Sequence, residues 1–330
     1  HPQTGLVDAF HGREDLAAGV LRCVGEPSLR FEEDALRILR ALRFASVYDF
    51  RIEEKTSEAI HALHPTLTRV AAERIRVELG KLLCGRAAAG ILRAYPDVLH
   101  TILPETAAMY GFEQHTPHHA YDVWEHTLHA LSAAPVDETL RFAILLHDAG
   151  KPEAFTLDGK GVGHMYGHAK LSAEKAESAM ARLKMDRATW EDVVLLTEKH
   201  DLPLEAERKM MKHRLNQLGE RRLRMLIQLQ RADALGKGTE EPEAVEARTK
   251  QQETILTELL AENACVTLKQ LAVSGHDLMQ AGVPAGKQIG VVLNALLVEV
   301  MDEKTPNERE SLLQRAKQLQ AAGGVYEQVE

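Results

Sequence analysis

The chain has 330 residues, of which 45% are hydrophobic and 27% are charged, a composition typical of a soluble globular protein. No run approaches the ~18 consecutive apolar residues of a membrane-spanning helix, so we expect no membrane partner. The net charge of −9 argues only weakly against a nucleic-acid partner, because the charge is unevenly distributed along the chain, so a polyanionic partner stays open.

Apolar residues recur every three or four positions through most of the chain, which predicts an all-α fold. The one exception is the stretch "FTLDGKGVGHMYG", in which Asp158-Gly159 predicts the turn of a small hairpin. A short helix is also expected near Leu271. The other expected helices, in chain order, are Glu32–Val47, Thr56–Leu63, Ala71–Leu83, Val123–Ala133, Glu138–His147, Ser172–Leu183, Trp190–His200, Lys209–Leu218, Glu220–Ala234, Pro242–Ala261, Gly286–Val300 and Asn307–Ala321.

The first of these helices carries a row of charged residues between apolar ones. Asp34, Arg37, Arg40 and Arg43 stand at steps of three, within a segment (residues 21–90) in which ten of 12 basic residues are Arg. Steps of three place successive members 60° apart around a helix, so Asp34 and Arg37 would be neighbours. A carboxylate beside a guanidinium fork can match the edge of a nucleobase. The alternative is an intrahelical Asp34–Arg37 ion pair followed by two solvated arginines.

The surrounding sequence resembles the neck of bacterial class II tRNA nucleotidyltransferases, the family of CCA-adding enzymes and poly(A) polymerases. The matching motifs are Asp8 to Gly12, the "GREDL" stretch, Glu-Asp-x-x-Arg at residues 33–37, "ERIRVELGKLL" and the late "LMQAGVPAGKQIGVVLNALL". The resemblance implies that Asp34 and Arg37 pair with the base of an incoming CTP or ATP. It also implies that Arg40 and Arg43 contribute to nucleotide binding, and that tRNA is the partner.

One departure from this family concerns the polymerising chemistry. The family carries it in an N-terminal head, where a pair of carboxylates holds Mg²⁺. The chain contains no Asp-x-Asp, and its first residues resemble only the segment directly after that head, so we interpret it as a fragment. The expected division is a remnant of the head (1–22), a nucleobase- and RNA-binding neck (23–100), a metal-dependent body (101–238) and a tRNA-binding helical tail (239–330).

Histidines and aspartates in the body follow a second family pattern. The segments "EHTL", "LLHDAGK", "GHAKLSAE", "EKHD" and "RADAL" resemble, in this order, the HD phosphohydrolase superfamily. The resemblance implies a divalent transition metal (Ni, Mn, Co, Fe or Zn) held by His126, His147, Asp148 and Asp233. It assigns His168 and His200 to a second metal or to the phosphate, and Lys151 to the phosphate. Taken singly, each histidine is also compatible with a place in the core, and His147-Asp148 with a plain helix end before Gly150 and Pro152.

The remaining features are less specific. Gly282, Pro284 and Gly286 precede an expected helix start at Lys287, where the family holds tRNA; a plain turn between two helices is the alternative. Three cysteines without a CxxC pair predict a reducing, cytoplasmic compartment and no thiolate metal site.

The expected function is therefore part of a tRNA nucleotidyltransferase that adds or repairs the 3′-terminal CCA of tRNA. A stand-alone HD phosphohydrolase and a non-catalytic tRNA-binding module are the alternatives. The choice between CCA, A, CC or poly(A) addition stays open, as does the oligomeric state.

Overall fold

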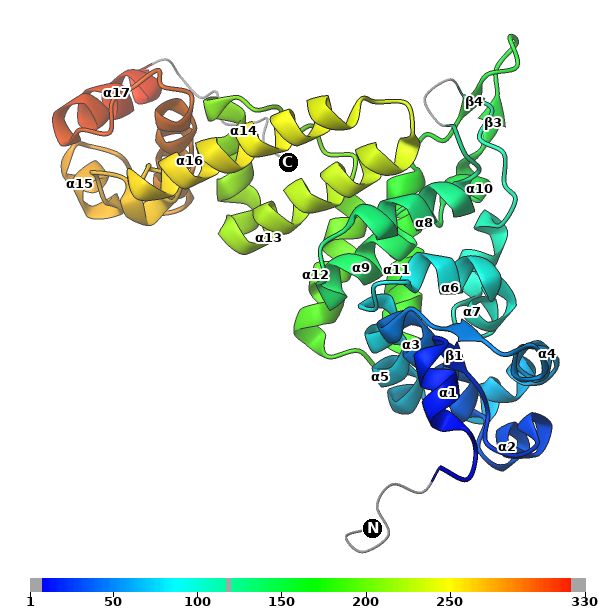
Figure 1. Ribbon diagram of the computed structural model, residues 1–330. Helices are drawn as coiled ribbons and strands as arrows, with labels where there is room; N and C mark the ends of the chain where they lie inside the picture. The colour runs from blue at the N-terminus through cyan, green and yellow to red at the C-terminus, as the bar shows by residue number, and fades with distance from the viewer. Residues whose placement is uncertain (1–7, 117–119, 322–330) are drawn as a thin grey trace, which may run out of the picture. The chain divides into compact units, whose positions relative to one another are not determined.

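A computed structural model describes residues 8–116 and 120–321 of the chain. This part of the protein is built from helices, with two short strand pairs, which confirms the all-α prediction (Figure 1). The chain forms two compact units. The first consists of the residues up to Leu202 together with Gln228–Glu246, and the second of Pro203–Ile227 and the residues from Ala247 onward. No helix of the described residues combines the length and the apolar character that crossing a membrane requires.

The first part of unit 1 is a group of short helices around a core that includes Phe31, Leu39, Ile60 and Leu79, each at most 2% exposed. Strands β1 (Val20–Leu21) and β2 (Arg51–Ile52) pair in parallel on this group. The helices are α1 (Gly12–Ala17), α2 (Pro27–Glu33), α3 (Leu36–Tyr48), α4 (Glu54–Leu63), α5 (Ala72–Leu83), α6 (Ala88–Ala94) and α7 (Pro96–Ile102), with 3₁₀ turns at His64–Arg69 and Pro104–Met109.

The prediction of one continuous helix from Glu32 to Val47 is wrong at its start. The chain breaks between α2 and α3, and Asp34 adopts an extended conformation there. Its Oδ1 accepts a hydrogen bond from the backbone N–H of Leu36 at 3.1 Å. Such a local side-chain contact competes with the helical hydrogen bonds of the backbone. Apolar spacing runs through both helices, so spacing alone could not reveal the break.

The second part of unit 1 surrounds α9, in which every residue from Thr139 to Leu146 is buried. Aspartate side chains begin three helices by accepting backbone N–H groups: Asp122 for α8, Asp137 for α9 and Asp186 for α12. The elements are α8 (Val123–Ala133), α9 (Glu138–Leu146), α10 (Lys151–Ala154), β3 (Thr156–Leu157), β4 (Gly163–His164), α11 (His168–Arg182) and α12 (Arg187–Lys199). The predicted hairpin is confirmed, since β3 and β4 pair antiparallel with Thr156 opposite His164.

Unit 2 contains the start of α13 (Arg208–Lys237) and most of α14 (Pro242–Ala261). Gly219 interrupts α13 with a φ of 74°, at the position where the sequence predicts one helix ending and another beginning. A 3₁₀ turn at Leu268–Gln270, α15 (Gly275–Gln280), α16 (Lys287–Met301) and α17 (Arg309–Ala321) complete the unit. Helix α16 begins at Lys287, as predicted.

A buried arginine joins the two parts of unit 1. Arg141 on α9 is 5% exposed and donates to four backbone carbonyl groups. Two of them, Leu83 and Gly85, lie at the end of α5, and the other two, Ala134 and Pro135, lie just beyond the end of α8. These carbonyls belong to helix ends, where the backbone has no partner of its own. One side chain therefore caps two helices.

We expect Arg141→Met to destabilise the protein by about 2–4 kcal/mol, because it leaves buried carbonyl groups without donors. Urea unfolding followed by circular dichroism measures the change. Arg187→Met is the control, since Arg187 is 92% exposed and pairs with Glu191 on its own helix, and we expect no measurable change in stability for it. Equal effects of the two substitutions would contradict this role of Arg141.

Candidate functional site

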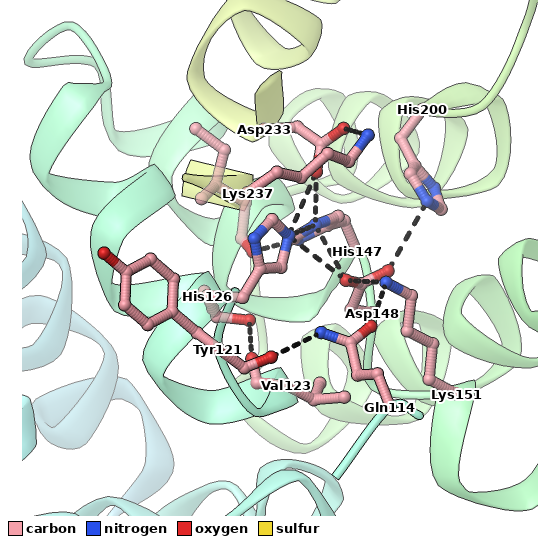
Figure 2. Close-up of polar contacts among 12 residues, drawn as sticks. Gln114, Tyr121, Val123, His126, His147, Asp148, Lys151, His200, Asp233 and Lys237 are labelled. Carbon is pink, nitrogen blue, oxygen red and sulfur yellow. Dashed lines mark hydrogen bonds and ion pairs between the residues drawn. The ribbon is translucent and has the colours of Figure 1, made fainter. Parts of the chain in front are cut away.

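The histidines and aspartates of the expected metal site come from five places in unit 1 and meet in its interior. Figure 2 shows all of them except His168. Each of these residues lies on a helix or just beyond the end of one. His126 lies on α8, His147 and Asp148 follow α9, His168 opens α11, His200 follows α12, and Asp233 lies on α13.

The first group consists of His126, His147, Asp148 and Asp233. The Nε2 atoms of the two histidines lie 3.2 Å apart. Asp148 Oδ2 is 3.3 Å from His126 Nε2 and 3.2 Å from His147 Nε2, while Asp233 Oδ1 is 3.0 and 3.4 Å from the same two atoms. Ligand atoms ~2.0–2.1 Å from a metal ion stand roughly 3.0–3.4 Å from one another. The spacing of these four side chains therefore fits one divalent ion.

The second group shares Asp148 with the first. Its other oxygen, Oδ1, lies 3.4 Å from His168 Nε2 and 3.7 Å from His200 Nε2, and those two nitrogens are 3.1 Å apart. Asp201 lies 3.2 Å from His168 and 3.3 Å from His200. Asp148 thus turns one oxygen to each group, as a carboxylate that bridges two metal ions does.

The backbone fixes the orientation of three of these imidazole rings. Each ring turns its Nδ1 to the carbonyl oxygen three residues earlier, which leaves Nε2 directed into the site. Metal-ligating histidines are usually oriented by such a contact. The acceptors are Ile144 for His147 at 2.7 Å, Met165 for His168 at 2.9 Å and Thr197 for His200 at 2.8 Å.

The turn after α9 can carry both His147 and Asp148 because Gly150 follows two residues after Asp148. A Cβ at Gly150 would lie 2.5 Å from the carbonyl oxygen of His168 and 2.6 Å from the amide nitrogen of Ser172. The Gly150 N–H instead donates to the Ser172 hydroxyl at 2.8 Å. The backbone of α11 therefore packs directly on this turn, and only glycine permits the approach.

Two lysines lie beside the carboxylates. Lys151 Nζ is 2.7 Å from Asp148 and also donates to Gln114 Oε1 at 2.9 Å, and Lys237 Nζ is 2.7 Å from Asp233 (Figure 2). Both lysines line a cavity of about 350 Å³ that reaches Asp148, Asp233 and the second group. The ammonium groups are therefore placed to meet an anionic ligand that enters the cavity.

The charges of the site determine which groups hold protons. Burial favours the neutral form of His147, but the carboxylates of Asp148 and Asp233 outweigh burial and raise the pKa of His147 to about 10. Burial likewise opposes ionisation of Asp148, yet His147 and Lys151 hold the pKa of that carboxyl well below its ordinary value. The metal-free site is thus an array of ion pairs, in which an entering metal ion must displace a proton.

The predicted nucleobase-reading residues form a second, more exposed site on unit 1. Asp34 pairs with Arg74 on α5 at 3.0 Å, and Arg37 pairs with Glu33 at 2.8 Å. The alternative of an Asp34–Arg37 ion pair is therefore wrong, because each residue has a different partner. Arg40 is exposed, and the described residues offer it no hydrogen bond or ion pair.

Arg43 is the most enclosed of the four. It pairs with Glu78 on α5 at 2.7 Å, with 17% of its side chain exposed, and its guanidinium group lies 3.9 Å from the centre of the Phe44 ring. It holds α3 to α5 and is less accessible to a ligand than Arg40.

Two family models match the chain. The model for tRNA nucleotidyltransferase domain 2 matches residues 164–316, and the model for the RNA and SrmB binding site of polymerase A matches residues 49–109. The chain is also 33% identical to the A-adding tRNA nucleotidyltransferase of Deinococcus radiodurans, over 94% of its own length and 74% of the relative's. This chain belongs to the tRNA nucleotidyltransferase family.

Other members of the tRNA nucleotidyltransferase family agree. The CC-adding tRNA nucleotidyltransferase of Thermus thermophilus is 33% identical to the chain, over 89% of the chain and 68% of that relative. The crystal structure of the Bacillus stearothermophilus CCA-adding enzyme in complex with CTP has the same fold, with a TM-score of 0.68 and 23% identity over 96% of the chain and 69% of that protein. The predicted family is thereby confirmed.

The sequence predicted that the six histidines and aspartates of the candidate metal site lie together, but it did not reveal three residues beside that site. Asp201 lies in the second group, Lys237 pairs with Asp233, and Gln114 accepts from Lys151. Asp201 directly follows His200 in "EKHD", and Lys237 stands four residues after Asp233 on one helix. Those two spacings were readable signals, whereas Gln114 is far from Lys151 in sequence and carries none.

We expect the protein to bind a divalent transition metal, and we expect binding to tighten as pH rises towards 10. The reason is that His147 keeps its proton below that pKa in the metal-free protein and must lose it to become a ligand. Calorimetric titration with Ni²⁺ at pH 7 in two buffers of different ionisation enthalpy measures the released protons.

His126→Gln and Asp148→Asn should each abolish stoichiometric binding. His276→Gln is the matched control, because His276 is an exposed histidine of unit 2. Metal binding without proton release, or unchanged binding by Asp148→Asn, would refute this metal site.

Proposed function

We propose that this chain is part of a tRNA nucleotidyltransferase that adds or repairs the 3′-terminal CCA of tRNA from CTP and ATP. The observation that carries the proposal is its similarity to A-adding and CC-adding relatives over 74% and 68% of their lengths. Polymerisation itself requires a head with Mg²⁺ held by a carboxylate pair, which the parent protein would supply. The three free cysteines suit the reducing cytoplasm, where we place this activity.

The neck would select the nucleotide. Asp34 presents a carboxylate whose pKa lies below its ordinary value: partial burial raises it, but hydrogen bonds from Arg74 and the Leu36 N–H and the charges of Arg74 and Arg37 together outweigh burial. It therefore accepts hydrogen bonds and donates none, whereas the guanidinium group of Arg37 only donates. Together they offer an acceptor for the amino group and donors for the neighbouring ring nitrogen that the base edges of CTP and ATP share. Arg74 and Glu33 hold the two groups in position, and Arg40 is free to meet a phosphate.

Transfer RNA would contact the neck and the residues around the start of α16. The exposed backbone at Gly286, with a φ of 112°, leads into the N-terminus of that helix, and helix N-termini favour phosphate groups.

Asp34→Ala in the head-containing protein should reduce discrimination of CTP and ATP against UTP and GTP by about 1–3 kcal/mol, because a wrong base no longer leaves polar groups unpaired. Incorporation on tRNA that lacks its 3′ end measures the change, and tRNA affinity should stay within twofold by filter binding. The control is Glu32→Ala, an exposed carboxylate two residues earlier. Full discrimination by Asp34→Ala would refute base reading by this residue. Absence of all incorporation by the wild-type head-containing protein would favour the non-catalytic tRNA-binding module.

A second activity, hydrolysis of a phosphoester, is favoured by the buried metal-ligand groups and their cavity. His126, His147, Asp148 and Asp233 would hold one metal ion, and His168 and His200 a second ion or the phosphate. A bound divalent metal supplies Lewis-acid activation of water and of a phosphoryl oxygen. Lys151 and Lys237 would bind the phosphate oxygens and orient the phosphorus in the cavity. The surrounding helices exclude bulk water, since His126, His147 and Asp148 are at most 1% exposed.

We expect the chain alone, loaded with Ni²⁺ or Mn²⁺, to hydrolyse a 2′,3′-cyclic nucleotide. Asp148→Asn should lower kcat roughly 100-fold or more, because it disrupts both ligand groups. Lys151→Met should raise KM more than it lowers kcat. The control is Lys175→Met, which replaces a lysine of α11 that pairs with Glu153 and does not line the cavity. A protein that binds metal but hydrolyses neither cyclic nor terminal phosphates would leave the metal a structural role only.

A further inference from the structure

The rim of the metal cavity carries an exposed aromatic pair that the proposed hydrolysis does not use. Tyr166 is 82% exposed, more than any other large hydrophobic residue of the described chain. Its ring is stacked on that of His164, with planes inclined by 6° and centres 5.3 Å apart. Both residues line the cavity that contains Asp148, Lys151 and His168. An exposed aromatic face thus adjoins the phosphate-binding groups.

The hairpin holds this pair in place. His164 belongs to β4, and its Nε2 lies 3.3 Å from Oδ2 of Asp158 at the turn. The other oxygen of Asp158 accepts the N–H groups of Lys160 and Val162 at 2.8 and 2.9 Å. Asp158 therefore fixes both the shape of the turn and the position of the imidazole ring, so that Tyr166 stacks on a supported ring.

The hairpin is also anchored to the chain segment that contains Gln114 and His115. The N–H of Gly163 donates to the carbonyl oxygen of His115 at 2.8 Å, and a Cβ at Gly163 would lie 2.2 Å from the carbonyl oxygen of Gln114. Gln114 in turn accepts a hydrogen bond from Lys151. The aromatic pair and the phosphate-binding lysine are thus connected through a few tightly packed residues.

We propose that Tyr166, supported by His164, stacks on the base of a nucleotide whose phosphate occupies the metal cavity, and so makes the site selective for nucleotides over other phosphoesters. The inference rests on the proposed phosphoester hydrolysis. Every nucleobase has a flat face, and stacking on an aromatic side chain contributes without regard to base identity. An aromatic platform beside cationic groups matches a ligand with a planar end and an anionic end. The site should therefore prefer nucleotides of any base.

The charges of the cavity determine how stacking can be measured. Once His147 has lost its proton to become a metal ligand, Asp148, Asp201 and Asp233 carry three negative charges against the two positive charges of Lys151 and Lys237. A phosphate therefore needs the charge of a bound divalent ion to enter. Adenosine 5′-monophosphate and ribose 5-phosphate carry the same phosphate and differ by the base. The ratio of their dissociation constants isolates the contribution of stacking.

The test is calorimetric titration of the Ni²⁺-loaded chain with each of these two ligands. We expect wild type to bind adenosine 5′-monophosphate roughly 5- to 150-fold more tightly than ribose 5-phosphate. Tyr166→Ala should remove this preference without changing ribose 5-phosphate binding, and Tyr166→Trp should keep it. Tyr110→Ala, which removes another exposed tyrosine (60%) outside the cavity, should bind as wild type does. In hydrolysis of 2′,3′-cyclic AMP, Tyr166→Ala should raise KM and leave kcat within twofold.

The outcomes separate this inference from the activity on which it rests. Equal binding of the two ligands, unaffected by Tyr166→Ala, would overturn stacking while the phosphate site stands. Failure of both ligands to bind the metal-loaded wild type would overturn the phosphohydrolase proposal and the inference with it. A preference for the nucleotide that survives in Tyr166→Ala would place base recognition elsewhere and overturn the role of Tyr166.

Discussion

Burial of the Asp148 carboxylate is the constraint on which unit 1 depends. Its side chain is 1% exposed, and an isolated charge in such a place would destabilise the fold by several kcal/mol. Lys151 at 2.7 Å and His147 at 3.2 Å compensate that charge directly, and His168 and His200 approach its other oxygen. Several helices must end or turn at the right residue to deliver these partners, so one carboxylate sets the arrangement of the helices around it.

Helix α5 connects this interior to the neck that we propose selects the nucleotide. One set of its side chains, Arg74 and Glu78, holds Asp34 and Arg43. Helix α5 also contacts α9, and Arg141 of α9 binds the carbonyl groups of Leu83 and Gly85 at the end of α5. The same α9 ends at His147 and Asp148. The contact between α5 and α9 therefore links the two sets of side chains. Those expected to read a base are held by α5, and those expected to hold a metal follow the end of α9.

The order of motifs along the chain was enough to predict which residues form the candidate metal site, but not which side chains contact one another elsewhere. The metal-site residues follow a recognisable order of local motifs, and Gly219 marks the break in α13, so both were readable. Asp34 was misplaced in a helix because the apolar pattern continues across it, and a single side-chain contact with Leu36 decides the break. The partners of Arg37 and Arg43 depend on competition among several nearby carboxylates. Such competition is settled by packing in three dimensions, which periodicity does not describe.

Unit 1 is built from two separate segments of the chain, which contribute unequally to the proposed metal site. Residues up to Leu202 supply every ligand but Asp233, which arrives with Gln228–Glu246 after the excursion through Pro203–Ile227. During synthesis the amino-terminal segments emerge first. The site therefore lacks Asp233 and Lys237 until Gln228–Glu246 has been synthesised and has packed onto unit 1. Closing such a long-range contact is slow compared with forming local helices. We therefore expect the proposed metal site to assemble late in folding, and a fragment that ends at Leu202 to lack Asp233 and Lys237 permanently.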